Sequence, residues 1–121
     1  MSANTDTVRT YLDGFNTSDH TKILSCLTDD IVWTVYGAYR ISGKAAYHEN
    51  IEAPGFIGPP RIEIVRLVEH GDTVMAELTA EVTRDSGEVM PLSMAEVFVM
   101  RDAKICERRA WVIELKENDF R

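Results

Sequence analysis

One carboxylic acid stands inside an apolar stretch of the sequence. Glu96 shares an alternating set of positions with apolar residues that belong on one face of a strand: Met90, Leu92, Met94, Phe98 and Met100. Burial disfavours the charged form of a carboxyl group, so we expect Glu96 to be a neutral hydrogen-bond donor or a general acid or base. The structural alternative is an ion pair with Arg108 or Arg109 of the next strand.

Two further side chains have the chemistry to assist Glu96. Tyr11 lies on the apolar face of an expected helix, where its hydroxyl can stabilise an oxyanion or simply bond a backbone carbonyl. His48 is a reserve candidate for a general base, because the ordinary pKa of an imidazole lies near neutral pH, although an exposed histidine is the favoured interpretation. The candidate catalytic residues are therefore Glu96, Tyr11 and His48.

Arg108 and Arg109 are neighbours on an expected strand, so their side chains must point to opposite faces. Whichever arginine faces inward can pair with Glu96 or bind a substrate carboxylate or enolate. Around this group we expect soft and aromatic side chains that suit a flat, apolar ligand. The candidate substrate-binding residues are Phe15, Trp33, Val35, Ile51, Phe56, Met94, Phe98 and Arg108.

Two helices are expected at the start of the chain. Apolar residues at helical spacing over 8–15 predict the first helix, and Asn4 or Thr5 can cap its start. A turn leads to a second short helix that Asp19 can cap. We expect the second helix to end at Thr28-Asp29-Asp30.

A strand pair and a third helix are expected to follow. Residues 31–36 and 39–41 are rich in β-branched and aromatic side chains, which favours strands. Ser42 is expected to cap a helix over about residues 43–52. The segment 54–60 is expected to be an ordered loop outside regular structure, because its prolines have no amide donor.

The second half of the chain predicts long strands over 61–69, 73–84, 88–100 and 104–115, joined by short turns. Strands of about ten residues or more twist and bend, and Pro91 predicts a bulge or an edge position. The helices must cover part of the concave face, and the rest becomes a pocket. We therefore predict an α+β fold with a cone-shaped, curved antiparallel sheet on three N-terminal helices.

The composition limits the classes of partner. A net charge of -7 with 13 Lys+Arg argues against nucleic acid, whose affinity depends on basic side chains. No segment predicts a membrane span or a secretory signal, so we expect a cytoplasmic protein without a membrane partner. We expect one domain over residues 1–121, with 116–121 as a flexible tail, and neither metal nor cofactor.

Three motifs carry a family resemblance: N-x-x-D-H at 16–20, L-T-D-D-I-V-W at 27–33 and I-S-G-K at 41–44. With the order of the expected elements, they resemble the nuclear transport factor 2-like superfamily, specifically its SnoaL-like and ketosteroid isomerase-like branches. The resemblance covers nearly the whole chain and implies the cystatin-like form of the α+β fold. The superfamily contains isomerases, polyketide cyclases, dehydratases, epoxide hydrolases and proteins without catalysis, so the fold alone does not give the function.

The resemblance also suggests roles for single residues. It places Tyr11 at the family's oxyanion-hole tyrosine and Glu96 at a protonated aspartic acid that donates the second hydrogen bond. Val35 falls where the isomerases have the aspartate that moves the proton, so ordinary isomerase chemistry is not expected. The epoxide-hydrolase branch needs an Arg-x-Asp, and Met94-Ala95-Glu96 lacks the arginine.

We therefore expect a SnoaL-like protein that binds a small, hydrophobic, carbonyl-bearing compound and assists isomerisation, cyclisation or dehydration without a cofactor. The alternative is a module of the same fold that binds a small ligand or dimerises without catalysis. Family members commonly dimerise through the sheet, so a homodimer is also expected. Trp111, Ile113 and Leu115 are candidates for that interface.

Overall fold

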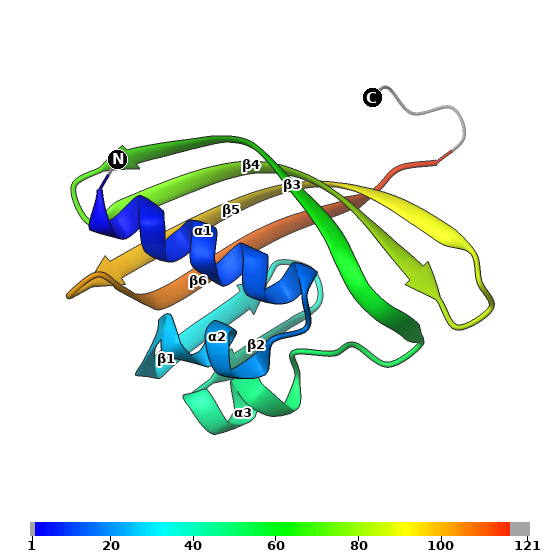
Figure 1. Ribbon diagram of the computed structural model, residues 1–121, viewed down its shortest axis with the longest axis horizontal. Helices are drawn as coiled ribbons and strands as arrows, with labels where there is room; N and C mark the ends of the chain where they lie inside the picture. Colours follow the sequence, from blue (N-terminus) through cyan, green and yellow to red (C-terminus); the bar gives the residue numbers. More distant parts are fainter. Residues whose placement is uncertain (1, 117–121) are drawn as a thin grey trace.

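In the computed structural model, which describes residues 2–116, three helices pack against one six-stranded sheet, as predicted for an α+β fold (Figure 1). Of the predicted tail, residues 117–121 lie outside this range. The helices are α1 (Ala3–Asn16), α2 (His20–Ser25) and α3 (Lys44–Glu49). The strands are β1 (Leu27–Val35), β2 (Tyr39–Ser42), β3 (Phe56–His70), β4 (Thr73–Arg84), β5 (Val89–Arg101) and β6 (Lys104–Glu114).

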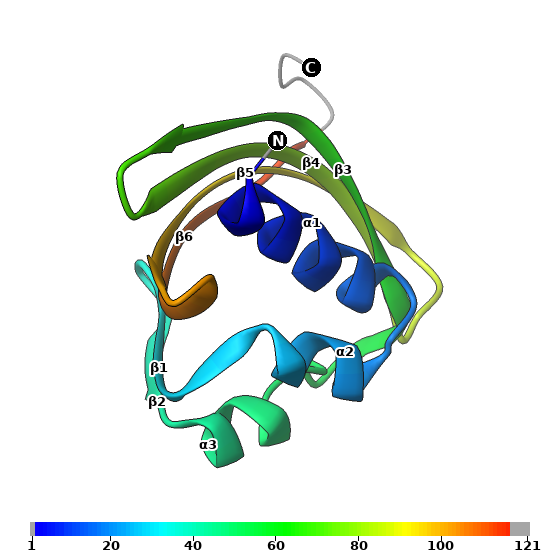
Figure 2. The same cartoon turned by 60° about the vertical axis from the view of Figure 1, so that its left-hand side comes forward.

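The sheet has the strand order β2-β1-β6-β5-β4-β3. Neighbouring strands are antiparallel except β1 and β6, which are parallel, so the sheet is mostly rather than wholly antiparallel. Figure 2 shows the long strands curving around α1, while α2 and α3 lie beyond α1, toward β1 and β2. The concave face therefore carries the core.

Helix α1 presents its apolar residues to this concave face, as their spacing predicted. Val8, Tyr11 and Phe15 are buried there. The cap is Ser2, two residues before the earlier of the two predicted caps, Asn4 and Thr5, because Ser2 and Thr5 form a reciprocal capping box. Gly14 permits close contact with α2, since a Cβ added there would lie 2.7 Å from Ile23 Cγ1.

Two predicted boundaries in the first half are wrong. Thr28-Asp29-Asp30 does not end a helix but lies inside β1, whose pairing with β6 starts at Leu27. Ser42 does not cap α3, because it is the last residue of β2 and pairs with Val32. Gly43 takes the cap position without a side-chain hydrogen bond, and α3 ends at Glu49 instead of residue 52.

The proline-rich segment is more regular than predicted. Strand β3 starts at Phe56 and passes through Pro59 and Pro60, with a register shift between Ile57 and Arg61. A sheet edge tolerates residues without an amide donor, and β3 is an edge strand. Pro91 does not mark a bulge, because it pairs in regular register with Glu81 of β4. On the β6 side, the strand pairing ends one residue away, at Leu92 and Glu114.

Candidate functional site

A buried ion pair with two tyrosines lies between the helices and the sheet. Arg108 of β6 donates from Nε to Glu96 Oε1 of β5 at 2.9 Å and from Nη2 to Oε2 at 2.8 Å. Its Nη1 donates to the hydroxyls of Tyr11 of α1 at 2.6 Å and Tyr47 of α3 at 3.0 Å. The two hydroxyls also hydrogen-bond to each other. We call these four buried side chains the Arg108 cluster.

Strand alternation and register bring the charged pair together. Glu96 faces inward between Met94 and Phe98, as predicted for this face of β5. Glu96 lies opposite Ala110 and Arg108 lies opposite Phe98, so the two charged residues are diagonal neighbours. The small side chain of Ala110 leaves room for the guanidinium beside the carboxylate.

The structure also decides between the two adjacent arginines. Arg108 faces the interior, whereas Arg109 is half-buried and places its Nη1 3.3 Å from Glu107 Oε2. The predicted opposite orientation of the two side chains is therefore correct. Arg108 is the arginine that pairs with Glu96.

Aromatic rings surround the guanidinium. The β1–β6 register places Trp33 directly beside Arg108, whose Cζ lies 4.6 Å from the indole centroid. The rings of Tyr11 and Phe15 each approach Cζ at 5.4 Å. These contacts are cation–π interactions, which strengthen when the cation is shielded from water. Within the described residues, the buried Nε1 of Trp33 has no hydrogen-bond partner.

The surroundings fix the protonation of the cluster. Burial alone would lower the pKa of Arg108, but the Glu96 carboxylate and the two tyrosines together outweigh it and hold that pKa well above its ordinary value. Burial raises the pKa of Tyr11 well above its ordinary value, against the opposing effect of Arg108. Burial likewise raises the pKa of Tyr47. At neutral pH both phenols therefore keep their protons and Arg108 keeps its charge.

A cavity of about 590 Å³ opens beside the cluster, within the size range of small-molecule sites. Its wall is mostly apolar and comes from all six strands of the sheet, the end of α1 and the segment after α3. Arg108 and Glu52 are the residues of this wall with formally charged side chains. The exposed wall residues gather at Tyr36–Tyr39 and at 52–58, so we place the mouth of the cavity between these segments.

Most of the predicted substrate-binding residues reach this wall. They are Phe15, Trp33, Val35, Ile51, Phe56, Met94 and Arg108. Phe98 does not, because it is fully buried and packs its ring edge-to-face against Tyr11, with centroids 5.6 Å apart. Phe98 is therefore a core residue that supports the Arg108 cluster.

Glu96 and Tyr11 lie behind the wall rather than on it. Both carboxylate oxygens of Glu96 accept hydrogen bonds from Arg108, so the carboxyl group is not the neutral donor that the sequence suggested. The alternative, an ion pair with an arginine of the adjacent strand, describes the geometry correctly. Arg108, rather than Glu96 or Tyr11, is the member of the cluster that lines the cavity.

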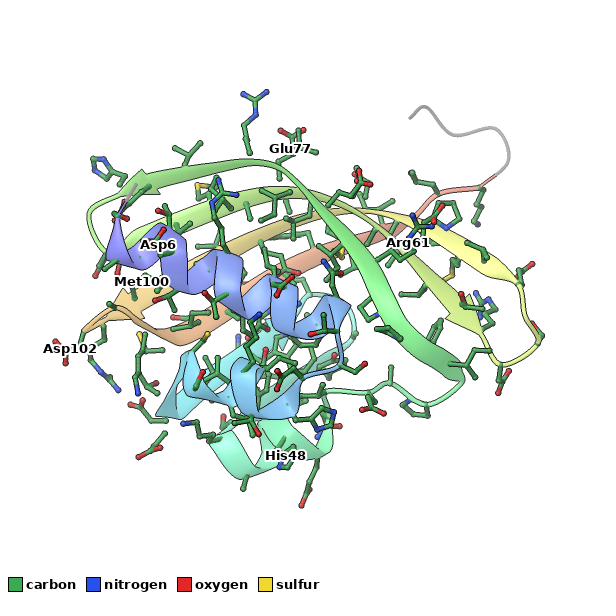
Figure 3. All side chains as sticks on the ribbon, in the orientation of Figure 1. Asp6, His48, Arg61, Glu77, Met100 and Asp102 are labelled. Carbon is green, nitrogen blue, oxygen red and sulfur yellow. The ribbon has the colours of Figure 1, made fainter. Side chains whose placement is uncertain are left out.

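His48 lies on the outside of α3, away from the sheet (Figure 3). Its Nε2 is 3.2 Å from His20 Nδ1, and His20 Nε2 is 2.6 Å from Glu52 Oε1. Glu52 in turn contributes to the cavity wall. His48 is thus connected to the cavity through two side chains but is not part of its wall.

Sequence reasoning missed Tyr47 and Glu52. Tyr47 is fully buried, but α3 is too short for its apolar spacing to show which side faces inward. Glu52 follows α3 outside any helix or strand, so no periodicity places it. The available sequence signal for Glu52 was its charge between an expected helix and Pro54, and this pattern is also typical of a solvated loop.

The arrangement can polarise an oxygen atom. Arg108 supplies a cation at the wall of an apolar cavity, where electrostatic interactions are stronger than in water. Glu96 and the two tyrosines fix the guanidinium from behind. The described residues include no group of three or more His, Cys, Asp or Glu arranged to hold a metal ion. No helix among residues 2–116 combines the length and apolar character needed to span a bilayer.

Comparison with known families and structures agrees with the observed fold. Residues 8–108 match the SnoaL-like domain family. Comparison with curated proteins gives no match. Solved structures named after ketosteroid isomerases and SnoaL-like polyketide cyclases share the architecture.

Three solved structures illustrate the range of proteins with this fold. An epoxide hydrolase from M. tuberculosis is 21% identical, with a TM-score of 0.82 over 92% of this chain and 83% of the other. An NTF2-like protein of unknown function from Burkholderia pseudomallei is 22% identical, with a TM-score of 0.84 over 91% and 90%. TerC, crystallised with polyporic acid, is 27% identical, with a TM-score of 0.82 over 90% of each chain.

Proposed function

The chain belongs to the SnoaL-like domain family, and from that premise we propose that it binds a small, largely apolar compound with a carbonyl group and assists proton transfer beside that carbonyl. The observation that carries the proposal is Arg108, a buried cation on the wall of an otherwise mostly apolar cavity. The reaction class is a cofactor-independent isomerisation, cyclisation or dehydration. The TerC complex with polyporic acid supports a small-molecule ligand for this fold.

Arg108 acts on the carbonyl oxygen in this proposal. When a proton leaves the carbon next to a carbonyl, negative charge develops on the oxygen, and a preorganised N–H donor in a dry site stabilises that charge. Tyr11, Tyr47 and Glu96 are positioning residues. They hold the guanidinium through hydrogen bonds but do not line the cavity.

Glu52 is the proton acceptor in this proposal. It is the carboxylate residue of the described cavity wall, and Val35 at the usual base position cannot accept a proton. The contact of Oε1 with His20 orients the carboxylate and leaves Oε2 to take the proton from the substrate carbon. Return of a proton from Glu52 to a different carbon would complete an isomerisation. If the Glu52 carboxyl first exchanges its proton with water, return to the same carbon would give exchange of the substrate proton with solvent.

Hydrogen–deuterium exchange of β-tetralone, an enolisable apolar ketone, tests the reaction. In heavy water, the wild-type protein should accelerate exchange of the α-protons as followed by NMR. Glu52→Gln should lower the enzymatic rate about 100-fold with ketone binding retained, which is typical for loss of a general base. Glu49→Gln is the matched control, because Glu49 ends α3 and does not line the cavity. Equal rates for wild type and Glu52→Gln would remove Glu52 from the mechanism.

Binding without catalysis is the second candidate function, and Val35 at the base position favours it. This alternative predicts that β-tetralone or a related ketone raises the melting temperature of the wild-type protein. It also predicts that the ketone's exchange rate equals that in protein-free buffer. Acceleration by the wild-type protein would exclude it.

We also propose that the outer, convex face of the sheet binds a second copy of the chain. Trp111 and Ile113 of β6 and Met75 of β4 expose apolar side chains on this face. Trp111 stacks on Tyr36 with centroids 4.9 Å apart, which forms a flat aromatic surface. An exposed apolar area of this kind on a small protein is typical of an interface.

A further inference from the structure

The hydrogen bonds of Arg108 leave it a small remaining capacity for a ligand. A guanidinium has five N–H donors. Nε and Nη2 each give one hydrogen bond to Glu96. The hydroxyls of Tyr11 and Tyr47 bond to each other and lie on the same side of Nη1, so they share one of its N–H groups. The described residues therefore engage three donors, and one N–H on Nη1 and one on Nη2 remain.

The charge of the guanidinium is also balanced from behind the wall. The Glu96 side chain is fully buried and lies 2.8 Å from Arg108 Nη2. Tyr11 and Tyr47 are neutral, so the Arg108 cluster as a whole carries no net charge. The other formally charged residue of the described wall, Glu52, adds a negative charge at the rim. A carboxylate ligand would therefore meet no surplus positive charge.

From this charge balance we propose that the cavity selects a neutral ligand with an acceptor oxygen, such as a ketone, and rejects the corresponding carboxylate. This selectivity rests on the proposed function, since it assumes that the cavity receives a ligand at Arg108. Glu96 is the specificity-determining residue, although it lies behind the wall, because it cancels the charge and occupies two donors of Arg108.

The physical cost falls on the charge of a carboxylate. Arg108 already gives its parallel Nε and Nη2 donors, and its charge, to Glu96. A carboxylate ligand would bring a second negative charge into an apolar cavity with no free cation to balance it, and such a buried charge is strongly disfavoured. A ketone oxygen needs one donor and brings no charge.

The test compares two probes with the same ring system: β-tetralone and the tetralin carboxylate that carries its carboxyl group at the ketone position. Isothermal titration of the wild-type protein at neutral pH should give roughly 10-fold or more tighter binding of the ketone. Glu96→Gln should reverse the order, because it frees the charge of Arg108 for the carboxylate. Glu77→Gln, the same change on the convex face, should leave the ketone preference intact.

A second variant covers the case in which Glu96→Gln does not fold. Arg108→Met/Glu96→Leu removes the donor and its counter-charge together, so it should bind β-tetralone about 10-fold more weakly than wild type, while the carboxylate, which gains no cation, still binds weakly. Unchanged ketone affinity in the double variant would show that Arg108 does not contact the ligand and would overturn the selectivity.

The remaining outcomes separate the two proposals. Wild-type protein that binds the carboxylate as tightly as the ketone overturns the selectivity and leaves the proposed ligand site intact. Binding of neither probe overturns the proposed function and this selectivity with it. A folded Glu96→Gln that still prefers the ketone overturns the role of Glu96.

Discussion

The two faces of the sheet each hold an arginine–glutamate pair at nearly the same distance. On the concave face, Arg108 and Glu96 lie 2.8 Å apart, with side-chain exposures of 9% and 0%. On the convex face, Arg66 of β3 and Glu77 of β4 lie 3.0 Å apart, with exposures of 70% and 58%. Figure 3 shows Glu77 projecting away from the helices. The pairs therefore differ in their surroundings rather than in their contact distance.

This difference determines what each pair can do. Water screens the exposed pair and competes for its hydrogen bonds, so such a pair contributes little to stability. The buried pair is held by further bonds from Tyr11 and Tyr47, and each of its charges depends on the other because water is excluded. The concave pair can therefore define a ligand site, whereas the convex pair belongs to the solvated surface.

Removing one partner of the concave pair should have the largest effect. Arg108→Met leaves the Glu96 carboxylate buried without its cation, and we expect a loss of about 3–5 kcal/mol in the free energy of unfolding. Urea unfolding followed by circular dichroism measures this loss. Arg108→Met/Glu96→Leu should recover most of it, because neither charge then remains buried alone. A single variant as stable as wild type would contradict the dependence of each charge on the other.

Substitution on the convex face should change association rather than folding. If two copies meet through the sheet, Trp111→Glu should weaken the dimer at least 10-fold, because a buried aromatic anchor is replaced by a charge. Sedimentation equilibrium should give twice the 13.7 kDa chain mass for wild type and for Trp111→Phe, and a smaller mass for Trp111→Glu. A monomeric wild-type protein at high concentration would rule out this interface.

High pH should lower the stability that the two buried tyrosines of the concave face contribute. The pKa values of Tyr11 and Tyr47 are raised in the folded protein, so the unfolded chain loses these protons first. Their contribution is therefore fully present below the ordinary tyrosine pKa of about 10 and declines as the pH rises above it. Urea midpoints measured from neutral to alkaline pH should show this decline.

The matched variant for the alkaline experiment is Tyr47→Phe. It should cost roughly 1–3 kcal/mol at neutral pH, because Arg108 Nη1 and the buried Tyr11 hydroxyl each lose a hydrogen-bond partner. It should also show a shallower alkaline decline than wild type, since one of the two buried phenols is gone. An equally steep decline would assign the alkaline effect to other groups.

The sequence reveals the concave face of β5 but not the partner that Glu96 finds there. Strict alternation on β5 predicts Glu96 inward, and the structure agrees. On β6, alternation counted from buried Ile105 would turn Arg109 inward. A register shift opposite Val99 and Met100 changes the phase, so that Arg108 faces inward instead. A bulge of this kind depends on pairing between strands, which a single sequence does not show.

The cavity wall is predictable to a similar degree. Trp33 and Met94 could be assigned to it because they lie on strands with a clear inward phase. Tyr47 and Glu52 could not, since a helix of six residues has too few turns to define a face and the segment after it has no period. The base proposed above therefore emerges only when the segment after α3 is placed beside His20.

The smallest effect is expected at the exposed pair. Glu77→Gln removes the charge partner of Arg66, yet both side chains remain in water, so the unfolding free energy should change by about 0–1 kcal/mol. The change should shrink further when urea unfolding is repeated at high salt, because the screening length falls well below the separation of most surface charges. A loss comparable to that of Arg108→Met would mean that contact distance, and not burial, governs the two pairs.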